Sequence, residues 1–229
     1  MILMGHRGAR NEKPENTMAG FQHIADLGLK CVELDIHLSK DGHLMVIHDE
    51  ALERTTNGQG AVNSHTLDEL QALDAGDGEK IPSLSEVLDL LLPLDFEIQI
   101  EIKDPQAVAP LLTYLNGLCD DQLKSLIIIS FDHRTIFKVK NQIPSIRTTA
   151  ILHGYPLDPC SIVKAARADG LSVNIAFADQ DLFEKLKEED YLVTVWNANT
   201  EEQYKAIKDL NIDYLATDAP TDLLKWMNN

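Results

Sequence analysis

Short apolar runs alternate with amphipathic segments along most of the chain. Nine runs are rich in Ile, Val and Leu and have the length of strands, at residues 2–5, 31–36, 44–47, 96–102, 126–130, 148–152, 171–175, 192–196 and 214–216. Segments with helical periodicity lie between most of these runs, and several begin at a good capping residue, such as Thr17 and Thr200. This alternation is typical of βαβ units, so it predicts a parallel sheet covered by helices.

The number of runs leaves two architectures open, a closed (β/α)8 barrel and an open doubly wound sheet. A barrel needs eight strands, so one candidate is surplus, and it is either 44–47 or 171–175. The pair Asp41-Gly42 is a hairpin signal between two runs, and it would replace a crossover helix if those runs were parallel barrel neighbours. Residues 50–95 contain the longest stretch without a strand and are rich in turn formers, so we interpret them as a small insertion within one domain that spans residues 1–229.

The charge balance narrows the classes of function. With 20 Lys and Arg against 37 Asp and Glu, the formal net charge is −17, which argues against nucleic-acid binding and adsorption to anionic membranes. The three cysteines are too few and too scattered for a disulfide framework. No apolar run approaches the roughly 20 residues that span a bilayer, and the sequence begins without a signal-peptide pattern. We therefore expect a cytoplasmic protein without a membrane anchor.

Acidic side chains interrupt two of the apolar runs. Glu33 and Asp35 are two residues apart, so in a strand both carboxylates face the same side. Either they lie at a solvent-facing edge or, if buried, they need a cation, and oxygen ligands point to Mg²⁺ or Ca²⁺. Glu101 and Lys103 repeat the pattern, either as an ion pair within one strand or at the carboxyl end of the barrel beside the first two acids.

Further polar residues lie at the ends of apolar runs. His6 and His48 are candidates for an acid/base pair, because imidazole titrates near neutrality. Arg7 and Lys103 are the basic groups of this otherwise acidic set, and they suit an anionic oxygen cluster such as phosphate. Trp196 is either core packing or an apolar wall for a small substrate. The chain contains no Walker loop, dinucleotide fingerprint or serine-hydrolase elbow.

A series of short motifs between residues 5 and 220 resembles the glycerophosphodiester phosphodiesterases, in particular the small cytoplasmic bacterial enzymes. The motifs are His6-Arg7-Gly8, Pro14-Glu15-Asn16-Thr17, Glu33-Leu34-Asp35, Asp41-Gly42, His48-Asp49, Arg54-Thr55-Thr56 with Gly58, Pro82-Ser83-Leu84, Glu101-Ile102-Lys103, Ser130-Phe131, Val195-Trp196 and Thr217-Asp218-Ala219-Pro220. Each motif is weak alone, and together, in the family's order, they are highly specific. The chain departs from the family at Asn197-Ala198-Asn199, where Thr-Val-Asn is usual.

The resemblance implies a (β/α)8 barrel similar to the phosphatidylinositol-specific phospholipases C, with a small insertion after the third strand. It also implies a role for each matching residue: catalytic histidines His6 and His48, metal ligands Glu33, Asp35 and Glu101, phosphate contacts Arg7 and Lys103, a substrate-side aromatic Trp196, and a supporting Glu15. The implied cofactor is one divalent cation, Mg²⁺ or Ca²⁺.

The implied reaction is hydrolysis of a glycerophosphodiester to sn-glycerol 3-phosphate and an alcohol. We favour attack by the glycerol 2-hydroxyl through a cyclic phosphate, with His6 as base and His48 as acid. The alternatives are a phospholipase D-like or lyase relative acting on lysolipids, a non-catalytic phosphate-binding barrel, and a Schiff-base aldolase that uses Lys103. The expected partner is the small-molecule substrate, and formation of a homo-oligomer stays open.

Overall fold

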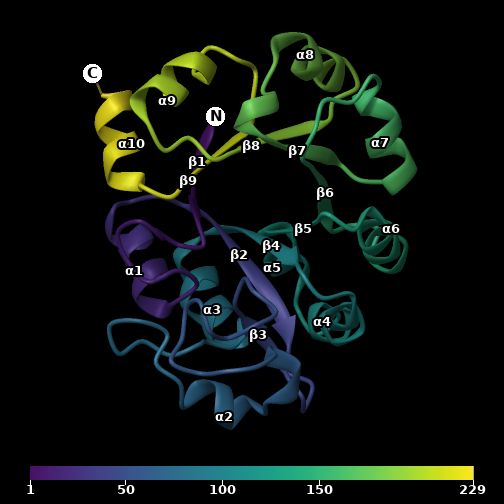
Figure 1. Cartoon of the computed structure of the whole chain (residues 1–229). Coiled ribbons are helices and arrows are strands. Elements are labelled where there is room, and N and C mark those ends of the chain that lie inside the picture. The colour runs from purple at the N-terminus through teal and green to yellow at the C-terminus, as the bar shows by residue number, and fades with distance from the viewer. Residues whose placement is uncertain (229) are drawn as a thin grey trace.

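Eight parallel strands close into a barrel in the computed structural model of the protein, which describes residues 1–228 (Figure 1). In their order around the barrel the strands are β1 (Ile2–His6), β9 (Tyr214–Thr217), β8 (Leu192–Trp196), β7 (Gly170–Asn174), β6 (Arg147–Leu152), β5 (Leu126–Ser130), β4 (Glu97–Ile102) and β2 (Cys31–Leu38). Pairing of β1 with β2 closes the barrel. The predicted (β/α)8 barrel is therefore confirmed, and the open sheet is excluded.

The surplus strand is β3 (Leu44–Val46), which pairs antiparallel with β2 and lies outside the barrel. The hairpin signal at Asp41-Gly42 explains this arrangement, because Gly42 adopts a positive φ of 88° that lets the chain reverse. A reversed strand cannot join a parallel barrel. The run at 171–175 accordingly falls in β7 and belongs to the barrel.

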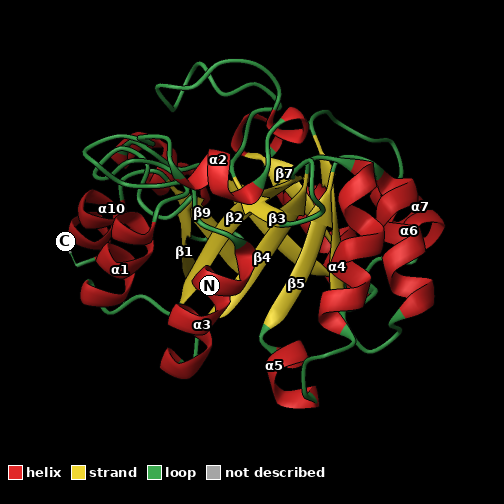
Figure 2. Cartoon of the chain, turned by 90° about the horizontal axis from the view of Figure 1, so that it is seen from below, coloured by secondary structure: helices red, strands yellow, loops and turns green. Residues whose placement is uncertain are grey.

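One helix follows each barrel strand and covers the outside of the sheet, as the red ribbons around the yellow strands show (Figure 2). These helices are α1 (Met18–Asp26), α3 (Leu84–Leu91), α4 (Val108–Leu115), α6 (His133–Gln142), α7 (Pro159–Ala166), α8 (Gln180–Glu188), α9 (Glu201–Ile207) and α10 (Pro220–Met227). The short helix α5 (Asp120–Lys124) leads into β5. Thr17 and Thr200 cap α1 and α9 as expected. Across residues 1–228, no helix has both the length and the apolar character needed to cross a membrane.

Along β2 and β4 the period of two separates apolar from acidic side chains. Leu34, Ile100 and Ile128 are fully buried in the large apolar core that the strands share with the helices. Their neighbours Glu33 and Glu101 point to the barrel interior instead and line a cavity there. The strands thus place acidic side chains inside the barrel without disturbing the apolar layer outside it.

Residues 47–82 leave the barrel between β3 and α3. They contain a short 3-10 turn, η1 (Val62–Ser64), and the helix α2 (Leu67–Gln71). A separate apolar cluster holds this segment together, formed by Met45, Ile47, Leu52, Val62, Leu70, Ala75 and Ile81. Helix α3, which also falls in the strandless stretch 50–95, packs into the barrel core. We propose that the segment is an insertion of a single barrel domain.

Candidate active site

A cavity of about 240 Å³ opens at the carboxyl ends of the barrel strands, and its two walls differ in character. The wall formed by β1, β2 and β4 carries charged side chains, among them His6, Glu33 and Glu101. The opposite wall, from β5 to β8, presents Ile129 and Trp196. One side of a bound molecule would therefore meet charge and the other a mainly apolar surface.

Glu33, Asp35 and Glu101 form a compact acidic cluster on the charged wall. One carboxylate oxygen of each lies within 4.8 Å of the others, and all three residues are buried. The pairing of β2 with β4 produces the cluster, because Asp35 stands beside Glu101 in the register. Glu33 Oε1 and Asp35 Oδ1 accept no hydrogen bond from the described part of the chain. Oxygen ligands in this arrangement fit a divalent cation.

The acids of this cluster do not ionise like ordinary carboxyl groups. Burial, reinforced by the charge of Asp35, raises the pKa of Glu33 well above its usual range and that of Glu101 to about 7. Burial also acts to raise the pKa of Asp35, but the charges of Arg7 and Lys103 outweigh it and hold that pKa below its usual value. Three adjacent negative charges are therefore not stable here without added positive charge.

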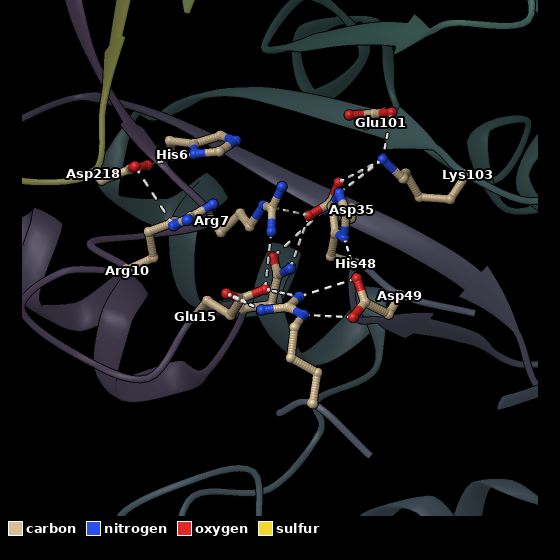
Figure 3. Close-up of polar contacts among 12 residues, drawn as sticks. His6, Arg7, Arg10, Glu15, Asp35, His48, Asp49, Glu101, Lys103 and Asp218 are labelled. Atoms are coloured by element: carbon tan, nitrogen blue, oxygen red, sulfur yellow. Dashed lines mark hydrogen bonds and ion pairs between the residues drawn. The ribbon is translucent and has the colours of Figure 1, made fainter. Parts of the chain in front are cut away.

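Two basic side chains face the acidic cluster (Figure 3). Arg7 Nε lies 3.3 Å from Asp35 Oδ2, and Arg7 Nη1 donates to Glu15 Oε1 at 3.0 Å. Lys103 Nζ donates to Glu101 Oε1 at 2.9 Å and lies 3.8 Å from Asp35 Oδ1. The Glu101–Lys103 ion pair at the carboxyl end of β4 and the inward-facing site are thus parts of one arrangement.

His6 and His48 each have a carboxylate at Nδ1. His6 Nδ1 contacts Asp218 Oδ1 at 2.5 Å, and His48 Nδ1 contacts Asp49 Oδ1 at 2.5 Å. The Nε2 atoms lie near the charged wall, at 3.7 Å from Glu33 Oε2 for His6 and 3.0 Å from Lys103 Nζ for His48. Burial lowers the pKa of both histidines, which favours neutral rings able to accept a proton.

Asp218 has a clear position in this site, although its residue type and motif alone suggested no role for it. Hydrogen bonds from Asn199 Nδ2 at 2.7 Å and Asn197 Nδ2 at 3.1 Å fix its carboxylate beside His6. Burial acts to raise the pKa of Asp218, but the hydrogen bond with His6 helps to keep it below the usual value. The signal in the sequence is a carboxylate directly after the last apolar run, where a barrel strand presents functional groups.

Aromatic side chains surround Trp196 on the apolar wall. The ring of Phe131 meets the Trp196 ring edge-on at a centroid distance of 5.9 Å, and the His153 ring lies 6.2 Å from it. Phe131 is 47% exposed and lines the same cavity, so this wall reaches the mouth. Trp196 thus borders the cavity rather than packing wholly into the core.

Comparison with known proteins points to one family. The profile of the glycerophosphoryl diester phosphodiesterase family matches residues 6–222. The chain is 32% identical over 241 residues to a glycerophosphodiester phosphodiesterase of Caldanaerobacter subterraneus, covering 97% of this chain and 96% of the relative. Its fold matches a phosphodiesterase of Oleispira antarctica solved in complex with the product sn-glycerol-3-phosphate, with a TM-score of 0.93, 25% identity and coverage of 100% and 97%. A glycerophosphodiester phosphodiesterase of Thermotoga maritima gives a TM-score of 0.82 at 29% identity, with coverage of 98% and 97%.

The pKa of Glu101 predicts how the stability of the metal-free protein depends on pH. The folded carboxyl, with a pKa of about 7, holds its proton more tightly than the unfolded one, whose pKa is 4.5. Its contribution to the free energy of unfolding is therefore complete below pH 4.5 and is lost as the pH rises through about 7. Urea unfolding in EDTA should show this loss, and Glu101→Gln should reduce it.

The matched control is Glu202→Gln, which removes an exposed carboxylate on α9. It should leave the pH dependence of the wild type unchanged. If Glu101→Gln and the wild type lost equal stability over this pH range, the raised pKa of Glu101 would be wrong.

Proposed function

Because the chain belongs to the glycerophosphoryl diester phosphodiesterase family, we propose that it hydrolyses glycerophosphodiesters to sn-glycerol 3-phosphate and an alcohol. The observation that carries this proposal is the charged wall of the cavity. It combines a carboxylate cluster suited to a cation, two basic side chains and two histidines whose Nδ1 atoms are held by aspartates. A site that only bound phosphate would have no use for the paired histidines.

Glu33, Asp35 and Glu101 would hold one divalent cation, Mg²⁺ or Ca²⁺. The donor set fits such an ion because it offers three carboxylates, and two of their buried oxygens lack a partner within the described residues. When bound, the cation supplies positive charge that stabilises a phosphate and makes a nearby hydroxyl more acidic. The raised pKa values of Glu33 and Glu101 support this assignment, since they show how poorly the cluster tolerates its own charge.

The two histidines move the protons of the reaction. His6 takes the proton of the glycerol 2-hydroxyl as that oxygen attacks phosphorus. His48 must first take up a proton on Nε2, and it gives that proton to the leaving alkoxide as its bond to phosphorus breaks. Water then opens the cyclic phosphate with the two proton transfers reversed. Burial supports the role of His6 as base, because it lowers the pKa of the ring and keeps it neutral.

Arg7 and Lys103 stabilise the charge that develops on the phosphoryl oxygens. Glu15 supports Arg7 through its hydrogen bond to Nη1. Trp196, together with Phe131, forms the wall against which the leaving alcohol lies. Lysolipids are the second candidate substrates, since Phe131 exposes apolar surface at the cavity mouth.

We also propose a cytoplasmic location. Cys31, Cys119 and Cys160 are all unpaired, and thiols stay reduced in that compartment. The partner under this proposal is the small-molecule substrate.

The first prediction concerns the reaction and its metal. Purified protein with glycerophosphocholine should release sn-glycerol 3-phosphate, measured with a coupled dehydrogenase assay. EDTA should abolish release, and Mg²⁺ or Ca²⁺ should restore it, because the carboxylate cluster would lack its cation. Full turnover after exhaustive chelation would refute the metal assignment. Turnover of lysophosphatidylcholine in place of glycerophosphodiesters would favour the second class of substrate.

The histidines provide a second prediction. His6→Ala and His48→Ala should each lower kcat by about 10²–10⁴-fold, the usual contribution of a positioned acid or base. The melting temperature should change little, since both rings lie at the cavity mouth. His43→Ala is the control, because His43 is exposed in the turn of the β2–β3 hairpin. Near-normal kcat in either active-site variant would remove that residue from the acid/base pair.

A third prediction separates the two roles that geometry allows for Lys103. If Lys103 donates to the phosphate, Lys103→Met should lower kcat/KM by about 10²–10³-fold while the cation affinity changes little, because the three carboxylates remain. Lys140→Met is a matched control. The Lys140 side chain is 17% exposed against 18% for Lys103, and it also pairs with a carboxylate.

The two variants distinguish catalysis from stability. Lys140→Met should lower the melting temperature without a large effect on kcat/KM. The same behaviour in Lys103→Met would show that Lys103 serves the fold and not the phosphate.

A further inference from the structure

We propose that Arg54 is a positioning residue of the active site, which holds Asp49 and Glu15 together and thereby fixes His48 and Arg7. Arg54 belongs to the insertion that follows β3, and the Arg54-Thr55-Thr56 motif has no role in the mechanism above. The inference rests on the proposed function for the reaction that it serves. The contacts on which the inference is based join residues of the protein to one another and do not depend on a substrate.

The guanidinium of Arg54 bridges two carboxylates. Arg54 Nε and Nη2 donate to Asp49 Oδ2 at 2.5 Å and Oδ1 at 3.0 Å. Nη1 and Nη2 donate to Glu15 Oε2 at 2.9 Å and Oε1 at 2.8 Å. A planar fork can satisfy both oxygens of a carboxylate at once, which a lysine cannot do. These four hydrogen bonds fix the position of both acids relative to each other.

Each of the two acids holds a different active-site group. Asp49 Oδ1 contacts His48 Nδ1 at 2.5 Å, and Glu15 Oε1 accepts from Arg7 Nη1 at 3.0 Å (Figure 3). His48 lies just after β3 and Arg7 just after β1, so the two groups come from separate parts of the chain. Arg54 therefore joins the insertion to the charged wall through two short chains of contacts.

The hydrogen bonds from Arg54 also influence the ionisation of Asp49 and Glu15. Hydrogen bonds from Arg54 lower the pKa of Asp49, and Arg54 and Arg7 overcome the effect of burial to lower that of Glu15 to about 2. Both acids stay ionised near neutral pH. In the free protein an ionised Asp49 favours the His48 tautomer with its proton on Nδ1, so that Nε2 faces Lys103 Nζ and is the atom that takes up the proton needed for the acid role.

A direct role with substrate is less well supported by the geometry. The residues that line the cavity include Arg7 and Lys103 but not Arg54. Its nitrogens are already engaged with Asp49 and Glu15. The side chain is 46% exposed, and exposed ion pairs contribute little to stability, so a role in the fold alone would also be small. The role that best fits Arg54 is therefore the orientation of His48 and Arg7 through Asp49 and Glu15.

The kinetic test uses Arg54→Met and Arg54→Lys with glycerophosphocholine and the activating cation. Loss of a partner that orients an active-site group typically costs about 10–100-fold, so kcat should fall by that factor in Arg54→Met with KM nearly unchanged. Arg54→Lys should recover part of kcat, since it restores the charge without the fork. Arg134→Met is the control, because the exposed Arg134 forms a similar two-point pair with Asp132 at the start of α6. It should retain the wild-type kcat.

Two kinetic outcomes would overturn the proposal. A raised KM with unchanged kcat would make Arg54 a substrate contact, and unchanged values of both would make it a surface ion pair. A mutant cycle adds a further criterion, with Asp49→Asn and Glu15→Gln combined as the background. In this double variant, Arg54→Met should have almost no additional effect on kcat. If Arg54→Met lowered kcat there by the same factor as in the wild type, Arg54 would not act through Asp49 and Glu15.

A spectroscopic test needs no turnover. The ¹⁵N shifts of the His48 ring in free protein should report a proton on Nδ1 in the wild type and a mixture of tautomers in Arg54→Met. Unchanged shifts would overturn the proposal even if the protein hydrolyses glycerophosphodiesters. The expected change would support it even if the reaction proved to be a different one, so the two proposals fail separately.

Discussion

The burial of three carboxylates in one small volume is the constraint on which the site depends. Glu33, Asp35 and Glu101 lie on adjacent strands, where the register fixes Asp35 beside Glu101. The hydrogen-bonded backbone gives these groups no way to move apart. Burying a charge costs roughly several kcal/mol per ion and repulsion between like charges adds to this cost, so positive charge must lie nearby. Burial, reinforced by the charge of Asp35, raises the pKa of Glu33 and Glu101, so the protein groups alone do not fully compensate for charge on this cluster.

The same constraint explains the position of the basic side chains. Arg7 and Lys103 contact the acids directly, so the groups proposed to bind phosphate also limit repulsion within the protein. The histidines lie just outside this cluster, each with an aspartate at Nδ1. The apolar wall with Trp196 completes the cavity on the other side. Charge is therefore confined to one half of the barrel mouth.

Local periodicity was sufficient to predict a parallel α/β sheet and the orientation of its acidic residues, whereas the choice of a closed barrel came from the family resemblance. Glu33 and Asp35 face the same side because a strand repeats every two residues, and no tertiary information is needed for that step. The choice of surplus strand was not available from this pattern, because residues 44–47 and 171–175 both have the length of a strand and only pairing distinguishes them.

The partners of the histidines depend on tertiary contacts. Asp218 reaches His6 across 212 residues of sequence. Its place directly after the last apolar run indicates the carboxyl end of the barrel but not which residue it contacts there. Arg54 lies in a segment whose path is set by a small apolar cluster, so its bridge to Glu15 follows from packing rather than from spacing. The residue roles that came from the family resemblance are consistent with these contacts and remain proposals.

Closure of the barrel by its first and last strands bears on how the protein is made. β1 pairs with β9, and the contact between His6 and Asp218 spans this closing seam. A chain still emerging from the ribosome lacks β9, so it has neither a closed sheet nor the aspartate that holds His6. Contacts between residues so far apart in sequence form late in folding, because closing a loop of nearly the whole chain has a high entropic cost. The closed site therefore requires the chain through Asp218, and a chain that stops before β9 lacks both the closing strand and the carboxylate beside His6.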